Sequence, residues 1–468
     1  MSTTNLAVII GHRGCFPGRL AEEGRRELLG QLKAWGVRPI VVGEKETRYG
    51  AVENLAEAGK CAAVFRKNRE KISGILVSLP NFGDERAIAE TIKMSELNVP
   101  VLVHAWPDDL PRMEIGSRRD SLCGKLSVCN VLGQYGIRFS LTDTHTVSPD
   151  SKEFRRVLDR FLAVCRVTNG LRRARIGVIG ARTTAFKTVR FSEKLLQAGG
   201  ISVETIDFSE IVTAVQKLKD SDPEVRARLT SLKKYCSTHG VPAEALATTA
   251  KMGVVIECWV KENELNAYAL QCWPAMQETL RIFPCALMSV MSESGLPAAC
   301  EADALGALSM YALQLAADAP AGLFDWNDNY GADPDKAVLF HCCNAPKSMM
   351  DNFCVDYNSI AVGSGGRKED SYGTCSAGMK KGPITFCRVT TDDTAGVIAS
   401  YAGEGEITGD PLKSFGGVGV ARIENLQEWL KFFCRNGFEH HVAISRSRVA
   451  DVLRESFANY LDWDVKQP

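Results

Sequence analysis

Hydrophobic positions along the first third of the chain alternate between two periodicities. Short runs rich in β-branched residues, typical of buried strands, are separated by stretches in which apolar residues recur every three or four positions, as in amphipathic helices. The expected strands cover residues 6–10, 38–42, 74–79 and 101–104, and the expected helices cover 19–35, 52–68, 86–95 and 153–171. This alternation predicts a parallel sheet with helices on both faces, whose ligands lie beyond the carboxyl ends of the strands.

A second series of the same kind follows a basic break at residues 172–175. It opens with the run I-G-V-I-G-A-R-T-T-A-F-K and continues to a buried strand within 267–274 that places Gln271 and Trp273 at its end. Glycines between a strand and a helix can hold an anion at the helix N-terminus. The spacing matches neither nucleotide fingerprint, G-x-G-x-x-G or G-x-x-x-x-G-K-[ST], so a tight turn is favoured over a phosphate loop.

The pattern changes from about residue 318, where turn residues become dense. The intervening runs at 359–362, 384–389 and 396–402 are β-rich, and helical periodicity returns only near 426–433 and 446–461. This pattern is typical of a mainly antiparallel domain. We therefore expect an α/β protein with two doubly wound α/β domains followed by a β-rich C-terminal domain. The expected boundaries are 1–172, 173–317 and 318–468, and a length of 468 residues agrees with two or three domains.

Charge and cysteine usage narrow the class of protein. Lys and Arg number 56, as do Asp and Glu, so the formal net charge is zero, which argues against nucleic-acid or membrane partners. No apolar run approaches the roughly 20 residues of a membrane span, and the N-terminus lacks signal-peptide features. The sixteen cysteines include no C-x-x-C, so we expect free thiols in a cytoplasmic protein rather than disulfides or a zinc site.

Candidate chemistry gathers in residues 300–343, where Glu301, Asp325 and His341 each adjoin apolar sequence. Carboxylates and imidazoles are the ligands of a divalent metal. Each residue also has an ordinary interpretation, since Glu301 could be a helix N-terminal charge and Asp325 a turn residue. His440 and His441 precede the strand-like run V-A-I-S, and strand alternation predicts that only one of the pair faces a pocket. The residues alone leave a metal site and unrelated polar residues both open.

Several ordered motifs carry a resemblance to a known family. They are C-E-A-D-A-L-G-A-L-S-M-Y, F-D-W, F-H-C-C-N, E-H-H-V-A-I-S, S-L-T-D-T-H, G-A-R-T-T-A-F, A-L-Q-C-W-P and G-T-C-S-A-G-M-K-K-G-P-I-T-F. The chain resembles the L-fucose isomerase/L-arabinose isomerase family from its first strand to its last helix. The resemblance implies two Rossmann-like α/β domains, a β-rich C-terminal domain and a hexamer whose active sites are shared between subunits.

The resemblance also implies site residues and a cofactor, Mn²⁺. The family's metal-binding Glu falls on Glu301, its second acid on Asp325 and its C-terminal histidine on His441, while His341 lies near a further histidine ligand of the arabinose isomerase branch. The substrate-binding positions fall on Arg13, Trp106, Gln271 and His341. Glu301 and Asp325 are the expected catalytic pair.

The function expected from these residues is metal-dependent interconversion of an open-chain aldose and its 2-ketose by an enediolate proton transfer. Arg13, Arg182, Lys187 and Arg190 near ligand-side turns leave room for an acidic sugar such as a sulfonate, although solvated surface charge is the favoured explanation of these residues. The alternative from another class is a non-catalytic sugar-binding or sensor protein. A nicotinamide dehydrogenase would need a dinucleotide loop, which the sequence does not contain.

Overall fold

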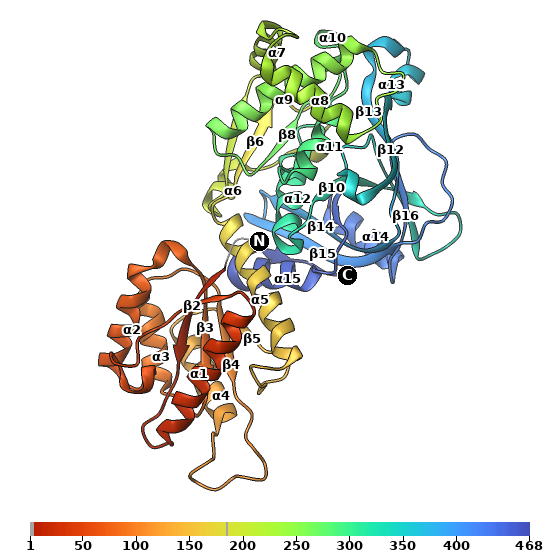
Figure 1. Cartoon of the computed structure of the whole chain (residues 1–468). Coiled ribbons are helices and arrows are strands. Elements are labelled where there is room, and N and C mark those ends of the chain that lie inside the picture. The colour runs from red at the N-terminus through yellow and green to blue at the C-terminus, as the bar shows by residue number, and fades with distance from the viewer. Residues whose placement is uncertain (1–3, 184–185) are drawn as a thin grey trace. The chain divides into compact units, whose positions relative to one another are not determined.

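The computed structural model describes residues 4–183 and 186–468, which form two compact units, Met1–Asn169 and Gly170–Pro468 (Figure 1). Both units mix helices and sheets, which confirms the α/β class. The second unit contains two sheets, and its division into two domains at residues 317/318 stays a prediction.

A parallel five-stranded sheet forms the centre of the first unit, in the order β2-β1-β3-β4-β5. Its strands are β1 (Asn5–Ile10), β2 (Arg38–Ile40), β3 (Ile72–Leu79), β4 (Val101–Ala105) and β5 (Ser140–Leu141). Helices α1 (Gly18–Ala34) and α5 (Lys152–Leu171) pack on one face, and α2 (Leu55–Lys67), α3 (Glu85–Ser95) and α4 (Ser121–Gln134) pack on the other. The strands and helices expected from periodicity in this unit are confirmed, and β5 and α4 are additional.

The second unit begins with a parallel four-stranded sheet in the order β7-β6-β8-β9. Its strands are β6 (Arg175–Ile179), β7 (Ser202–Ile206), β8 (Ala267–Leu270) and β9 (Ala298–Ala299). The surrounding helices are α6 (Glu193–Ala198), α7 (Phe208–Lys217), α8 (Pro223–Tyr235), α9 (Ala243–Glu262), α10 (Ala275–Thr279) and α11 (Cys285–Glu293). An apolar core joins this sheet to α7, α9 and α11.

The second sheet of this unit has nine strands, most of them antiparallel. They are β10 (Ala321–Asn329), β11 (Lys336–His341), β12 (Met350–Tyr357), β13 (Tyr372–Met379), β14 (Gly382–Asp392), β15 (Val397–Ile407), β16 (Gly417–Arg422), β17 (His441–Ser445) and β18 (Asp464–Val465). Only the β13–β16 and β15–β18 pairs among them are parallel. A further pairing of β15 with β16 closes β16-β11-β10-β17-β14-β15 into a ring, against which the aromatic face of α14 (Leu426–Asn436) packs.

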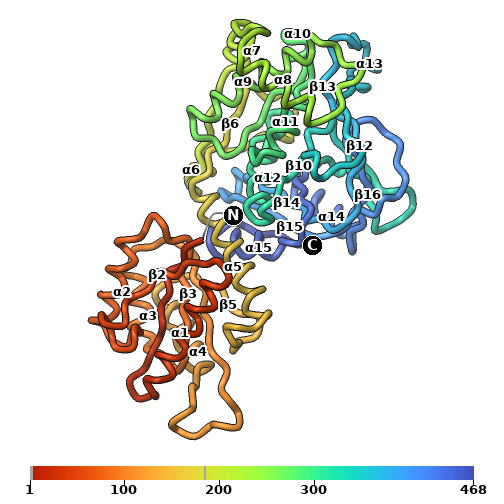
Figure 2. The backbone as a smooth tube through the Cα atoms, viewed as in Figure 1, coloured from red at the N-terminus to blue at the C-terminus, as the bar shows by residue number. Residues whose placement is uncertain are grey.

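One apolar helix joins the two sheets of the second unit. Helix α12 (Ala304–Ala317) contacts β8 and β9 of the parallel sheet as well as β10, β14 and β17 of the ring (Figure 2). Ten of its fourteen residues are buried, as its largely apolar sequence requires. The start of this helix therefore lies where both sheets can present side chains to one site.

One predicted element is wrong. Residues 359–362 form the start of a short helix, α13 (Ser359–Gly363), and not a β-rich run. The Asn358 side chain accepts a hydrogen bond from the backbone N–H of Ala361 and so caps the helix. Ile360 is 55% exposed and has no sheet face to pack on, so its strand propensity has little effect.

The structure also bears on the expected state of the cysteines and on membrane-spanning helices. All sixteen cysteines are free thiols, as predicted. Among the described residues, none of the helices has the length and apolar character that crossing a membrane requires.

Candidate active site and metal centre

Three neighbouring strands of the ring bring an acid and two histidines to the same edge. Asp325 of β10 pairs with Phe340 of β11 on one side and with His441 of β17 on the other. His341 is the last residue of β11, and His441 is the first residue of β17. The strand register alone therefore places Asp325, His341 and His441 together.

Glu301 reaches this edge from the parallel sheet. It lies between β9 and α12, where the backbone of Glu301 and Ala302 is left-handed, with φ of 63° and 56°. Trp273, just after β8, donates a hydrogen bond from Nε1 to Glu301 Oε1 at 3.2 Å. Burial alone would raise the pKa of Glu301, but the neighbouring His441, His341 and Trp273 lower it to about 2. The carboxylate is therefore ionised at neutral pH.

The donor atoms of these residues converge. One ligand atom each from Glu301, His341 and His441 lie within 4.8 Å of one another, and the same holds for Asp325, His440 and His441. His441 Nε2 lies 2.9 Å from Glu301 Oε2 and 3.5 Å from Asp325 Oδ1. Two carboxylates and two or three imidazoles thus surround one small volume.

Three of these candidate ligand atoms are buried and lack a fixed hydrogen-bond partner. Asp325 Oδ1 and His341 Nδ1 have no hydrogen-bond partner among the residues that the structure describes, and Glu301 Oε2 has none while His441 Nε2, 2.9 Å away, carries no proton. Leaving buried polar atoms unpaired costs on the order of 1–3 kcal/mol each, so such groups in a folded protein call for an explanation. A divalent cation coordinated by carboxylate oxygens and imidazole nitrogens satisfies all three atoms, so the donor set fits a metal.

A fully buried ionic network orients His441. Its Nδ1 donates to Asp303 Oδ2 at 2.8 Å. Asp303 also accepts two hydrogen bonds from Arg388 of β14, at 2.6 and 3.0 Å, and caps α12 by accepting from the N–H of Gly306 at 2.8 Å. Arg388 in turn donates to Glu439 at 3.1 Å. Since Nδ1 carries the shared proton, Nε2 of a neutral His441 directs its lone pair at the Glu301 and Asp325 oxygens, where a cation would lie.

The charges of this network shift the pKa values of its members. Burial would lower the pKa of His441, but Asp303 and Glu301 raise it to about 10. Burial would likewise raise the pKa of Asp303, whereas Arg388 and His441 hold it well below its usual range. Without a cation, the site is therefore stabilised by a second proton on His441.

His440 differs from the expectation that only one histidine of the pair faces the site. Its side chain is 41% exposed, yet its Nε2 lies 3.7 Å from Asp325 Oδ1. The strand begins at His441, so strand alternation does not apply to the residue before it. Burial and the charge of His441 lower the pKa of His440.

The other predicted site residues have well-defined surroundings. Gln271 accepts a hydrogen bond from the N–H of Ala181 at 2.9 Å and so ties the end of β8 to the segment after β6. In the first unit, Arg13 pairs with Glu85 and donates to the carbonyl of Gly83 at 2.9 Å. Trp106 is 4% exposed and donates to Ser78 Oγ at 3.1 Å, so its indole N–H is already used within the core.

Sequence reasoning missed four residues that shape the site, namely Asp303, Arg388, Glu439 and Phe186. Phe186 lies beside two of the candidate metal ligands, with its ring centroid 5.6 Å from that of His440 and 6.0 Å from that of His441. The signal for Arg388 was present, because an arginine within the β-rich run I-T-F-C-R-V predicts a buried ion pair.

Comparison with known proteins gives matches at both ends of the chain. The family described as "Fucose/sulfoquinovose isomerase, N-terminal domain" matches residues 7–172, and that described as "L-fucose isomerase, C-terminal domain" matches residues 339–467. The chain is 24% identical over 456 residues to the sulfoquinovose isomerases of Priestia aryabhattai and Priestia megaterium, covering 97% of each chain. It is also 24% identical over 366 residues to the sulfoquinovose isomerase of Alkalicoccus urumqiensis, covering 76% of this chain and 78% of that protein.

Proposed function

Because this chain belongs to the fucose isomerase-like family and is an aldose–ketose isomerase, we propose that its substrate is a sulfonated aldohexose, sulfoquinovose, which it converts into the 2-ketose. The support for this substrate is the similarity to sulfoquinovose isomerases along 97% of the chain. The resemblance found in the sequence motifs is thereby confirmed at the level of the family, as is the expectation of an enzyme.

We further propose that Glu301, Asp325 and His441 hold a divalent cation, Mn²⁺, and that His341 completes the set. The observation that carries this proposal is the convergence of buried donor atoms without partners, Glu301 Oε2, Asp325 Oδ1 and His341 Nδ1. When bound, the cation supplies Lewis acidity to O1 and O2 of the sugar.

The two carboxylates have separate tasks in the proposed reaction. One takes the proton from C2 and returns it to C1, while the other moves a proton from the O2 hydroxyl to O1, so that atoms and charge balance. Glu301 is ionised and is oriented by Trp273. His440 Nε2 lies 3.7 Å from Asp325 Oδ1, so a proton would pass between the two side chains through one bridging water.

Neighbouring side chains orient the groups and limit the access of water. Asp303 holds the His441 ring with its Nε2 toward the two carboxylates. The rings of Phe186 and Trp273 pack edge to face near the histidines, with centroids 6.3 Å apart and an interplanar angle of 75°. An apolar wall of this kind strengthens the electrostatic interactions of the developing negative charge on the sugar oxygens.

The test is an isomerase assay with sulfoquinovose and a panel of neutral aldoses, monitored by ketose formation. We expect turnover of sulfoquinovose that EDTA abolishes and Mn²⁺ restores. Turnover that survives complete removal of metal would contradict the proposed cofactor. Turnover of neutral aldoses only would contradict the proposed substrate and leave the isomerase activity in place.

We also propose that the protein is cytoplasmic and forms a hexamer in which the first unit of one subunit, including Arg13 and Trp106, contributes to the active site of another. The support is the family resemblance alone. Size-exclusion chromatography with light scattering tests it, and a monomer with full activity would contradict the shared site.

A further inference from the structure

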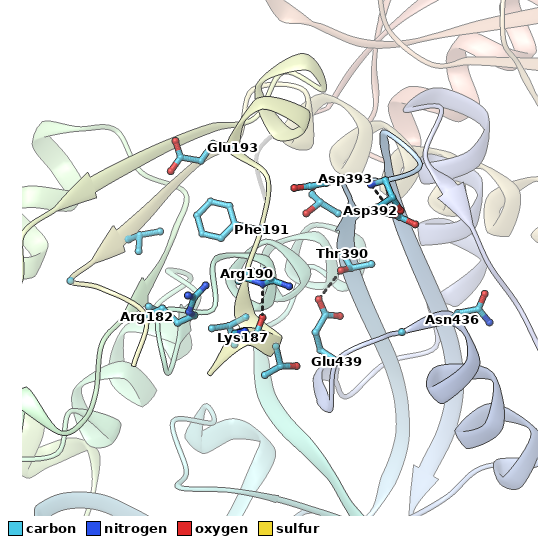
Figure 3. Close-up of a pocket in the computed structure, with 18 residues that line it drawn as sticks. Arg182, Lys187, Arg190, Phe191, Glu193, Thr390, Asp392, Asp393, Asn436 and Glu439 are labelled. Carbon is cyan, nitrogen blue, oxygen red and sulfur yellow. Dashed lines mark hydrogen bonds between the residues drawn. The ribbon is translucent and has the colours of Figure 1, made fainter. Parts of the chain in front are cut away.

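A cavity of about 1020 Å³ adjoins the proposed metal site. It is lined by Ala302, which directly follows Glu301, and by Glu439, which directly precedes His440. The cavity is larger than an open-chain hexose needs, and its remaining walls come mainly from the segment after β6, the end of β14 and the end of α14 (Figure 3). None of the proposed metal ligands lines the cavity itself, and the link between the two is made by Ala302 and Glu439, the chain neighbours of Glu301 and His440. A sugar held at the metal site by O1 and O2 would extend its other carbons past these two residues.

The segment after β6 brings cationic side chains to this cavity. Phe186 of this segment is fixed beside the metal ligands, with its ring centroid 5.6 Å from that of His440. Lys187 follows it directly and begins a short 3₁₀ turn, and Arg190 closes the turn through hydrogen bonds from its N–H and Nε to the Lys187 carbonyl, at 3.2 and 3.3 Å. Arg182, Lys187 and Arg190 are all exposed and all line the cavity, and Figure 3 shows them away from Asp392 and Asp393.

Four acidic residues also line the cavity, and two of them, Glu193 and Asp393, are exposed and form no ion pair within the described residues. The other two have partners. Glu439 is neutralised by Arg388 at 3.1 Å and accepts a hydrogen bond from Thr390 at 2.6 Å. Asp392 accepts three hydrogen bonds from its own turn, from the N–H and hydroxyl of Thr394 and the N–H of Ala395. By contrast, no ion pair of Arg182, Lys187 or Arg190 occurs within residues 4–183 and 186–468. The cationic wall thus retains donors for a ligand.

We propose that Arg182, Lys187 and Arg190 form the subsite for the sulfonate at C6 of the substrate. The inference rests on the proposed isomerase function and assigns the residues that select an anionic sugar. A sulfonate offers three acceptor oxygens and one negative charge, which suit guanidinium and ammonium donors. Its position at the end of the sugar opposite to C1 and C2 matches a cationic wall in the cavity beside the metal ligands.

The experiment compares sulfoquinovose with 6-deoxyglucose, which lacks only the sulfonate. For Lys187→Gln, Arg182→Gln and Arg190→Gln we expect KM for sulfoquinovose to rise about tenfold or more per lost charge-assisted hydrogen bond, with kcat within about twofold. KM for 6-deoxyglucose, or its inhibition constant where it is not turned over, is expected to stay unchanged. All three side chains are exposed, so the variants should fold as the wild type does.

Lys194→Gln is the matched control. Lys194 is an exposed lysine of α6 four residues after Arg190, and it does not line the cavity, so its removal reports the effect of net charge alone. Wild-type turnover of sulfoquinovose with unchanged KM in all three variants would overturn the subsite but leave the proposed substrate in place. An equal rise in KM for 6-deoxyglucose, or for the control, would also overturn it. Absence of sulfoquinovose turnover by the wild type, with turnover of a neutral aldose, would reject the proposed substrate together with the subsite.

Discussion

Replacing Asp303 by asparagine would remove one charge from the network behind the proposed metal site and leave the side-chain volume nearly unchanged. Asp303 accepts hydrogen bonds from His441 Nδ1 and from both terminal nitrogens of Arg388. An asparagine has one acceptor oxygen, so its amide group must face at least one of these donors. His441 then loses the partner that fixes its proton on Nδ1.

The expected loss of stability in Asp303→Asn follows from the buried ion pair that the substitution disrupts. Removing one partner of a buried ion pair costs about 3–5 kcal/mol. Because Glu439 still pairs with Arg388 at 3.1 Å, we expect the lower end, about 3 kcal/mol, in the unfolding free energy of the second unit. Loss of the residue that orients a metal-binding histidine typically lowers metal affinity by about 10–100-fold.

The assay is titration calorimetry or Mn²⁺ electron paramagnetic resonance on metal-free protein, beside denaturant unfolding. Glu439→Gln is the matched control, because Glu439 also binds Arg388 but makes no hydrogen bond to His441 in the described part of the chain. We expect both variants to lose stability and only Asp303→Asn to lose Mn²⁺ affinity. Unchanged Mn²⁺ affinity in Asp303→Asn, or an equal loss in Glu439→Gln, would refute the orienting role.

Three further predictions concern other residues. Glu301→Gln and Asp325→Asn should each lower kcat by about 10²–10⁴-fold in steady-state assays with metal bound, and near-wild-type turnover in both would contradict their roles as acid–base groups. Phe186→Ala should lower kcat/KM about tenfold by admitting water near the histidines, with unchanged Mn²⁺ affinity; unchanged kinetics would argue against an apolar wall there. Burial lowers the pKa of His104 to about 4 from 6.5. As pH falls, His104 is therefore protonated in the unfolded chain before it is protonated in the folded chain. The unfolding free energy of the first unit should fall by up to about 3 kcal/mol between pH 6.5 and pH 4. Denaturant unfolding of His104→Gln across this range should lack that loss, and an identical pH dependence would contradict it.

Periodicity was sufficient for the first unit because its helices and strands alternate strictly. Strands such as β1 and β3 are buried on both faces and therefore have mostly apolar sequences. The strand pairings of the ring could not be predicted from the sequence, because they join segments far apart in the chain, such as β10 and β17. The misassigned residues 359–362 illustrate the limit, because a single capping side chain, Asn358, decides between helix and strand there.

The residues of the candidate site also fall into those that the sequence could predict and those that it could not. Glu301, Asp325 and His441 could be named from motifs because each lies in a distinctive string. Asp303 lies in the same string as Glu301, but there it has the sequence signature of an ordinary helix cap, which it also is. Asp303 also orients His441 and pairs with Arg388, which lie 138 and 85 residues further along the chain. No local sequence pattern could reveal these contacts.

The left-handed backbone at Glu301 and Ala302 sets stability against activity at the centre of the site. For residues other than glycine this conformation costs roughly 1–2 kcal/mol each, so folding alone would favour glycine at both positions. Glycine at 301 would relieve strain but would remove the carboxylate. Selection for a more stable chain and selection for an active one therefore oppose each other at this residue, and strain relief at Ala302 is the one gain of this kind that leaves the carboxylate in place.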